Sequence, residues 1–143
     1  MSEHVQGQQG QQVDWDAIRR EAGPYPLEAY HFVREGLSYT ANMVFGEGDP
    51  MSELDRHVTG QELCLGLKNY AVDQWGMLAP VVLECWGIRR SEDFGRIVFA
   101  MIDAGLMSRR PDDSLDDFRG VFDFREVFSH QELAAHIGEG ASP

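Results

Sequence analysis

Residues 59–124 decide the fold of this 143-residue chain, and they read TGQELCLGLKNYAVDQWGMLAPVVLECWGIRRSEDFGRIVFAMIDAGLMSRRPDDSLDDFRGVFDF. Thr59-Gly-Gln-Glu62 is a capping box, in which the Thr59 hydroxyl accepts from the Glu62 N–H and the Glu62 side chain reaches back. Apolar residues at helical spacing follow as far as Gly76 and predict a first helix. Pro80 suits the first turn of a shorter helix, which we expect to run through Trp86.

A third helix and a two-stranded ribbon are predicted to follow. Ser91 is the expected N-cap, and the acids Glu92 and Asp93 complement the helix dipole. Residues 106–108 and 121–124 are expected to form two strands joined by a turn. Three helices followed by such a β-hairpin are the element order of a winged-helix domain, so we predict a mainly α fold with a winged-helix-like core.

The residues before this core predict a helical N-terminal arm. Residues 1–12 are rich in Gln and Gly, and we expect them to form a disordered polar tail. Asp14 can cap a short helix, and Pro26 can begin a longer one that ends near Phe45. A Gly- and acid-rich loop is expected to connect this arm to the core.

These elements predict a single globular domain over residues 13–128. Its arm covers residues 13–55 and its winged-helix-like core covers residues 56–124. Residues 129–143 are expected to form a short helix, which a capping box at Ser129 favours, and a frayed acidic tail.

The composition favours a cytosolic protein without a membrane span. The net charge is −12, and hydrophobic residues make up 43% of the chain. The N-terminus lacks the basic start and apolar stretch of a signal peptide, and no later segment approaches a membrane span. Cys64 and Cys85 lie in apolar helical patterns, as small core residues do in a reducing compartment.

Several phrases of the sequence are distinctive in combination. They are Tyr25-Pro26-x-x-Ala29-Tyr30-x-Phe32-Val33, Arg56-His57-Val58-Thr59-Gly60-Gln61-Glu62-Leu63, Glu84-x-Trp86-Gly87-Ile88, Asp93-Phe94-Gly95-x-Ile97-Val98-Phe99, Ala104-Gly105-Leu106-Met107 and Asp117-Phe118. They resemble those of an uncharacterised bacterial hypothetical-protein family, found mainly in the planctomycete–verrucomicrobial lineage. The resemblance covers about residues 14–124 and implies no activity, because none is assigned to the family, so it brings no functional residues with it.

Arginine placement gives the candidate binding residues. Two arginine pairs flank the predicted third helix, and a fifth arginine lies within it. Arginine forks suit phosphate or carboxylate recognition. The expected wing tip and the start of the third helix are acidic, however, which disfavours a nucleic-acid backbone. The candidate residues are Arg89, Arg90, Arg96, Arg109 and Arg110.

Residue patterns for other chemistry are weak. The acidic run at residues 112–117 lacks the glycine and distal glutamate of a calcium loop, so a solvated turn with a helical cap is the favoured interpretation. His57 stays open as a partner of Cys64 or Cys85, because sequence separation does not preclude contact. We expect no catalytic residue, no metal and no cofactor.

Three functions remain as hypotheses. The first is a non-enzymatic cytosolic protein-interaction domain that engages a protein partner through its acidic surface. The second is nucleic-acid or ribonucleoprotein binding through the arginine pairs, and the third is an enzyme with a Cys/His or carboxylate site. Charge balance favours the first.

Overall fold

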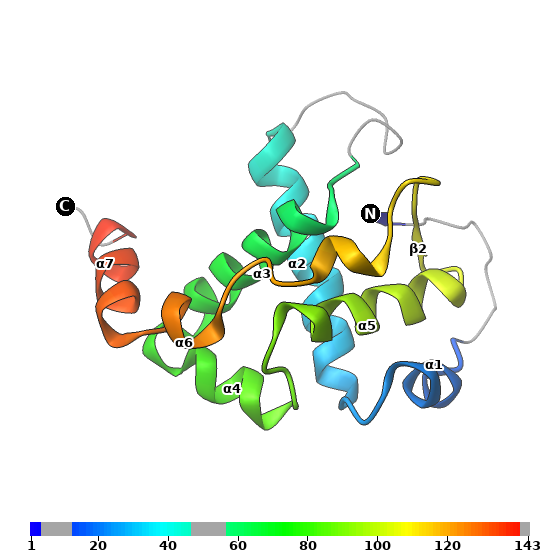
Figure 1. Ribbon diagram of the computed structural model, residues 1–143, viewed down its shortest axis with the longest axis horizontal. Helices are drawn as coiled ribbons and strands as arrows, with labels where there is room; N and C mark the ends of the chain where they lie inside the picture. Colours follow the sequence, from blue (N-terminus) through cyan, green and yellow to red (C-terminus); the bar gives the residue numbers. More distant parts are fainter. Residues whose placement is uncertain (4–12, 47–56, 141–143) are drawn as a thin grey trace.

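The computed structural model describes residues 1–3, 13–46 and 57–140, and these residues form a mainly helical fold (Figure 1). The predicted mainly α class is confirmed. Among the described residues no helix is both long and apolar enough to cross a membrane. The elements are β1 (Ser2–Glu3), α1 (Trp15–Ala22), α2 (Leu27–Phe45), α3 (Gly60–Trp75), the 3-10 helix η2 (Gly76–Leu78), α4 (Ala79–Cys85), α5 (Ser91–Asp103), β2 (Met107–Ser108), the 3-10 helix η3 (Leu115–Phe118), α6 (Phe124–Val127) and α7 (His130–Gly140).

The helix starts follow their caps. The Asp14 carboxylate accepts from the Ala17 N–H at 3.1 Å, so α1 begins where predicted. At the start of α3, Thr59 Oγ1 accepts from the Glu62 N–H at 3.1 Å, and Glu62 Oε1 accepts from the Thr59 N–H at 2.8 Å. Both halves of the predicted capping box are thus confirmed.

The cap of α5 differs from the prediction. Ser91 is the first residue of the helix and is fully buried, and its hydroxyl donates to the Phe118 carbonyl at 2.6 Å. The capping carboxylate belongs to Asp93, which accepts from the backbone N–H groups of Arg89 at 2.8 Å and Arg90 at 3.0 Å. Ser91 is therefore a tertiary contact, and the prediction that it caps the helix was wrong.

Helices α2 and α3 pack closely along their length because two glycines lie in the contact. A Cβ on Gly36 would lie 2.2 Å from Leu67 Cδ2, and a Cβ on Gly66 would lie 1.8 Å from Thr40 Oγ1. Both distances are far below van der Waals contact. The absence of a side chain at Gly36 and Gly66 therefore sets the separation of the two helices.

Helix α5 carries the rest of the core. Its buried face includes Phe94, Ile97, Val98 and Met101, as the spacing predicts, and it packs on α1, α2 and η3. The fully buried Phe118 of η3 lies against α5 at Gly95, where a Cβ would come within 2.9 Å of the Phe118 ring.

The predicted hairpin is wrong, and the winged-helix arrangement is not confirmed. Strand β2 pairs antiparallel with β1, with Ser2 opposite Ser108. Residues 121–124 do not return as a strand, because Phe124 begins α6 and its ring lies 6.1 Å from the Phe94 ring. The alternating apolar pattern of this segment therefore reflects ring packing beside α5, where no strand is present.

The N-terminal residues also differ from the prediction. The Met1 side chain is fully buried, and Ser2–Glu3 form β1, so these three residues are not a disordered tail. Residues 4–12 of that predicted tail, residues 47–55 of the predicted loop at 46–55 and the last residues 141–143 lie outside the described residues. At the other end, α7 extends to Gly140, beyond the predicted start of fraying.

Candidate binding site

The arginine pairs lie at opposite ends of α5. Arg89 and Arg90 precede its first residue, while Arg109 and Arg110 follow β2. Thirteen residues of α5 separate the ends, which is about 20 Å at 1.5 Å per residue. Arg96 lies within α5 and lines another pocket, near α1. The five predicted binding residues therefore do not form one patch.

The second pair makes contacts within the chain. The Arg109 guanidinium lies over the Phe99 ring, 5.5 Å from its centroid. The Arg110 backbone N–H donates to Asp113 at 2.8 Å. The positive charge of the Arg110 side chain helps to lower the pKa of His57. Arg109 and Arg110 thus belong to the local structure around β2.

The first pair borders a groove of about 690 Å³ between the start of α5 and the start of α6. A third arginine, Arg125, lines the same groove, together with the half-buried rings of Phe122 and Phe124. These three residues were not among the predicted binding residues, because residues 121–124 were predicted to form a strand and Arg125 was predicted to follow it. We call this feature the arginine groove, defined by Arg89, Arg90, Glu92, Gly120, Val121, Phe122, Asp123, Phe124, Arg125 and Glu126.

Asp93 fixes one wall of the arginine groove. Its carboxylate is buried, accepts from the Arg89 and Arg90 backbone N–H groups and also accepts from the Tyr25 hydroxyl at 2.6 Å. Burial, followed by the Asp93 hydrogen bond and charge, raises the pKa of Tyr25 well above its usual range. The buried Asp93 carboxylate therefore fixes the backbone of Arg89 and Arg90.

Hydrogen bonds to α5 fix the other wall. The Val121 N–H donates to Ser91 Oγ at 3.2 Å, and the Gly120 N–H donates to Glu92 Oε1 at 3.4 Å. The Asp123 carboxylate then caps α6 by accepting from the Arg125 N–H at 2.8 Å. These contacts place Arg125 opposite the start of α5.

Two carboxylates of the arginine groove, those of Glu92 and Asp123, accept hydrogen bonds from backbone N–H groups. Burial raises the pKa of Glu92, but hydrogen bonds, chiefly from its own N–H and the Gly120 N–H, together with the charge of Arg90 outweigh burial, and the pKa is lowered overall. Within residues 1–3, 13–46 and 57–140, none of the guanidinium groups of Arg89, Arg90 and Arg125 donates a hydrogen bond or forms an ion pair. Three forked donors are thus available to an anionic ligand.

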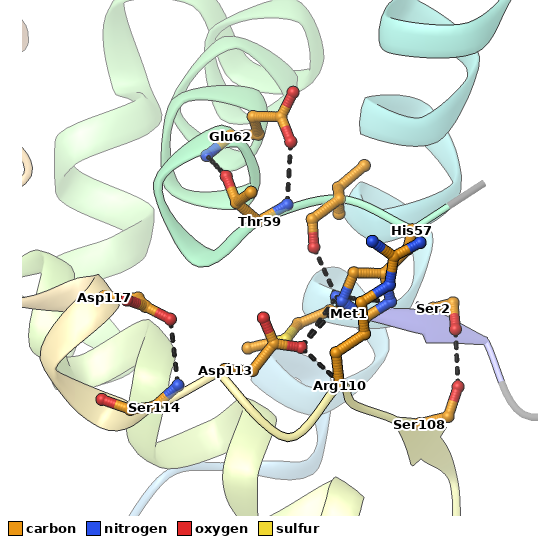
Figure 2. Close-up of polar contacts among 11 residues, drawn as sticks. Met1, Ser2, His57, Thr59, Glu62, Ser108, Arg110, Asp113, Ser114 and Asp117 are labelled. Atoms are coloured by element: carbon orange, nitrogen blue, oxygen red, sulfur yellow. Dashed lines mark hydrogen bonds and ion pairs between the residues drawn. The ribbon is translucent and has the colours of Figure 1, made fainter. Parts of the chain in front are cut away.

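A second polar cluster lies beside β1 (Figure 2). His57 Nε2 lies 2.7 Å from Asp113 Oδ2 and 2.7 Å from the Met1 amino group, which also donates to the Val58 carbonyl. Burial lowers the pKa of the Met1 amine to about 6, although Asp113 opposes this shift. Burial and then the neighbouring amine lower the pKa of His57.

This cluster fastens the N-terminus in place and does not bring histidine to a thiol. Among the described residues, His57 forms no hydrogen bond with Cys64 or Cys85. Cys64 is fully buried, and burial followed by the charge of Glu92 raises the pKa of its thiol well above its usual range. The Cys–His contact that the sequence left open therefore has no geometric support among the described residues.

The helical cap predicted within the acidic run at residues 112–117 is confirmed, whereas the predicted solvated turn is wrong for Asp113, which is buried against His57. Asp117 Oδ2 accepts from the Ser114 N–H at 2.9 Å (Figure 2). Ser114 Oγ accepts from the Asp116 N–H at 3.0 Å. In the part of the chain that the structure describes, no group of three or more His, Cys, Asp or Glu side chains is placed to hold a metal ion.

Comparison with known proteins adds no assignment. No protein-family model matches the chain, and no curated protein and no solved structure matches it either. The resemblance to a planctomycete–verrucomicrobial family therefore stays a prediction, and any function has to be inferred from the residues themselves.

Proposed function

We propose that the chain is a non-enzymatic protein-interaction domain whose arginine groove binds an acidic segment of a partner protein. The observation that carries the proposal is the imbalance in this groove. The carboxylates of Glu92 and Asp123 are engaged in hydrogen bonds, while the guanidinium groups of Arg89, Arg90 and Arg125 make no hydrogen bond or ion pair among the described residues. Arginine and aromatic side chains are enriched among the strongest contacts of protein interfaces.

The rings give the groove a second property. Phe122 and Phe124 are half-buried and their ring centroids lie 5.3 Å apart, while the Phe124 ring also contacts the buried Phe94 ring. An acidic segment with an apolar residue can therefore place its carboxylates on the guanidinium groups and its apolar side chain against the rings. A partner segment of mixed acidic and apolar character fits both features.

The surroundings disfavour a nucleic acid as the partner. Glu92, Asp123 and Glu126 line the same groove, and the whole chain carries a net charge of −12. A continuous phosphate backbone would meet these carboxylates, whereas a short acidic peptide can avoid them. The two free cysteines, Cys64 and Cys85, suit a reducing compartment, and we place the interaction in the cytoplasm.

A quantitative affinity capture tests the proposal. The full chain with a C-terminal tag is compared with Arg89→Ala/Arg90→Ala/Arg125→Ala after nuclease treatment of the lysate, and captured proteins are measured by mass spectrometry. A specific partner should be depleted at least about tenfold by the triple substitution, since each central arginine contact is worth more than about 1 kcal/mol.

A matched control removes the same charge elsewhere. Arg20→Ala/Arg34→Ala/Arg119→Ala changes three arginines outside the groove and should retain the partner. The proposal is wrong if the groove variant and the control capture the same proteins in the same amounts. Salt-sensitive anisotropy with duplex DNA or structured RNA, abolished by the groove substitutions, would instead establish the nucleic-acid alternative.

A further inference from the structure

A second pocket, apart from the arginine groove, is lined by aromatic rings and carboxylates. It has a volume of about 220 Å³ and lies where α2 meets the C-terminal end of α3 and the residue that follows α4. Figure 1 shows α4 leaving this end of α3. We call it the aromatic pocket, and the residues that matter here are Phe32, Tyr70, Trp75, Trp86, Glu28 and Glu35.

The rings of the aromatic pocket form a floor and walls. Phe32 is buried and stacks on Tyr70 at 5.4 Å and on Trp75 at 5.2 Å. Trp75 and Trp86 are half-buried, lie 5.4 Å apart and have planes 83° from parallel. A small ligand in the corner between two perpendicular indoles can lie over the face of one ring while it touches the other.

The charges at this pocket have one sign. Glu28 and Glu35 are exposed carboxylates on the same face of α2, about two turns apart, and Glu35 Oε2 accepts from the Tyr70 hydroxyl at 2.9 Å. Burial, followed by this hydrogen bond, raises the pKa of Tyr70. His31 is the one lining residue with a basic side chain, and no lysine or arginine lines the pocket. Aromatic faces and carboxylates both attract cations.

We propose that the aromatic pocket binds a methylated ammonium group. Its volume is below the ~300–1,000 Å³ of pockets for drug-sized ligands, so it suits a group of a few heavy atoms. The carboxylates lie on the α2 side, so the part of a cation that lies over the rings of Trp75 and Trp86 meets no hydrogen-bond acceptor from them, and an N–H group there would lack a partner. A trimethylammonium group has no N–H to satisfy, presents apolar methyl groups to the rings and carries the complementary charge.

A methylated ammonium group can belong to either of two ligands, a small quaternary amine or a methylated lysine side chain on a protein. Choline and a trimethyl-lysine peptide are the two probes. Tryptophan fluorescence is the readout, in a Trp15→Phe background that leaves only Trp75 and Trp86. Choline should give a saturable change with a dissociation constant on the order of 1 mM, as expected for a ligand of this size.

The neutral isostere of choline, 3,3-dimethylbutan-1-ol, separates cation binding from simple apolar contact. It should bind at least about fivefold more weakly than choline at equal ionic strength. The peptide with unmodified lysine should likewise bind more weakly than the trimethylated one. Tighter binding of the trimethylated peptide than of choline identifies a protein source, and the reverse identifies a small molecule.

Charge-neutralising variants test whether the carboxylates of Glu28 and Glu35 contribute to binding of the cation. Glu28→Gln/Glu35→Gln should weaken choline binding about three- to tenfold and leave dimethylbutanol binding unchanged. Glu21→Gln/Glu132→Gln removes two exposed carboxylates outside the pocket and should have no effect. The inference is overturned if choline and dimethylbutanol bind equally, if choline does not bind at all, or if both double variants behave alike. None of these outcomes depends on the arginine groove.

Discussion

Substitution of Gly66 by alanine should destabilise the protein, although alanine is the better helix former. Gly66 lies in α3 against α2, and its new Cβ would lie 1.8 Å from Thr40 Oγ1 and 2.7 Å from Thr40 Cβ and Cγ2. Ordinary contact between such atoms begins near 3.4 Å. Thr40 cannot simply rotate away, because its hydroxyl donates to the Gly36 carbonyl at 2.7 Å and its β-branched side chain is restricted in a helix.

The magnitude follows from three contributions. Overpacking of a tight core contact costs about 1–3 kcal/mol. Loss of the Thr40 hydrogen bond increases the destabilisation by about 1 kcal/mol, and the higher helix propensity of alanine decreases it by about 1 kcal/mol. The free energy of unfolding should therefore fall by about 2 kcal/mol, which urea denaturation followed by circular dichroism resolves.

Two further variants locate the effect in this contact. Thr40→Ala removes the two closest atoms, so adding Gly66→Ala in that background should cost at least about 0.5 kcal/mol less than in the wild type. Gln74→Ala, at an exposed position of the same helix, should leave stability nearly unchanged. An unchanged or increased free energy of unfolding for Gly66→Ala would refute the inference that this glycine sets the separation of α2 and α3.

Two other predictions concern titration and thiol reactivity. Burial lowers the pKa of the Met1 amine from 8.0 to about 6 and lowers the pKa of His57, so the unfolded chain binds protons first on acidification. The free energy of unfolding should thus fall by about 2 kcal/mol between pH 8 and pH 6, and equal denaturation midpoints at the two pH values would contradict this. Cys85 is exposed and Cys64 is fully buried, so iodoacetamide should modify Cys85 at least about a hundredfold faster under native conditions. Peptide mapping by mass spectrometry measures both rates, and similar rates would argue against the burial of Cys64.

Sequence analysis found the helices whose ends are marked by nearby residues. Asp14, Thr59 and Gly76 act within one turn of the helix that they start or stop, so their effect is visible in the sequence. Ser91 was misassigned because its hydroxyl bonds to Phe118, 27 residues away, and no local pattern reports such a contact.

The errors at the candidate site have the same origin. Phe122 and Phe124 alternate with polar residues as in a strand, yet their positions are set by each other and by Phe94 of α5. Arg125 reaches the arginine groove only through that arrangement. The Arg89 and Arg90 pair was recognised from composition alone, because adjacent arginines before a helix are evident without knowledge of tertiary structure.

The pairing of β1 with β2 has a consequence for hydrogen exchange. The ladder has only two residues in each strand, so it is the fully buried Met1 side chain and the contacts of its amine with His57 that hold β1 against β2. The Val58 amide, which donates to the Met1 carbonyl, should therefore exchange slowly, as amides in the middle of α3 do, because its exchange requires Met1 to leave the core. Early exchange of the Val58 amide would show that β1 opens locally.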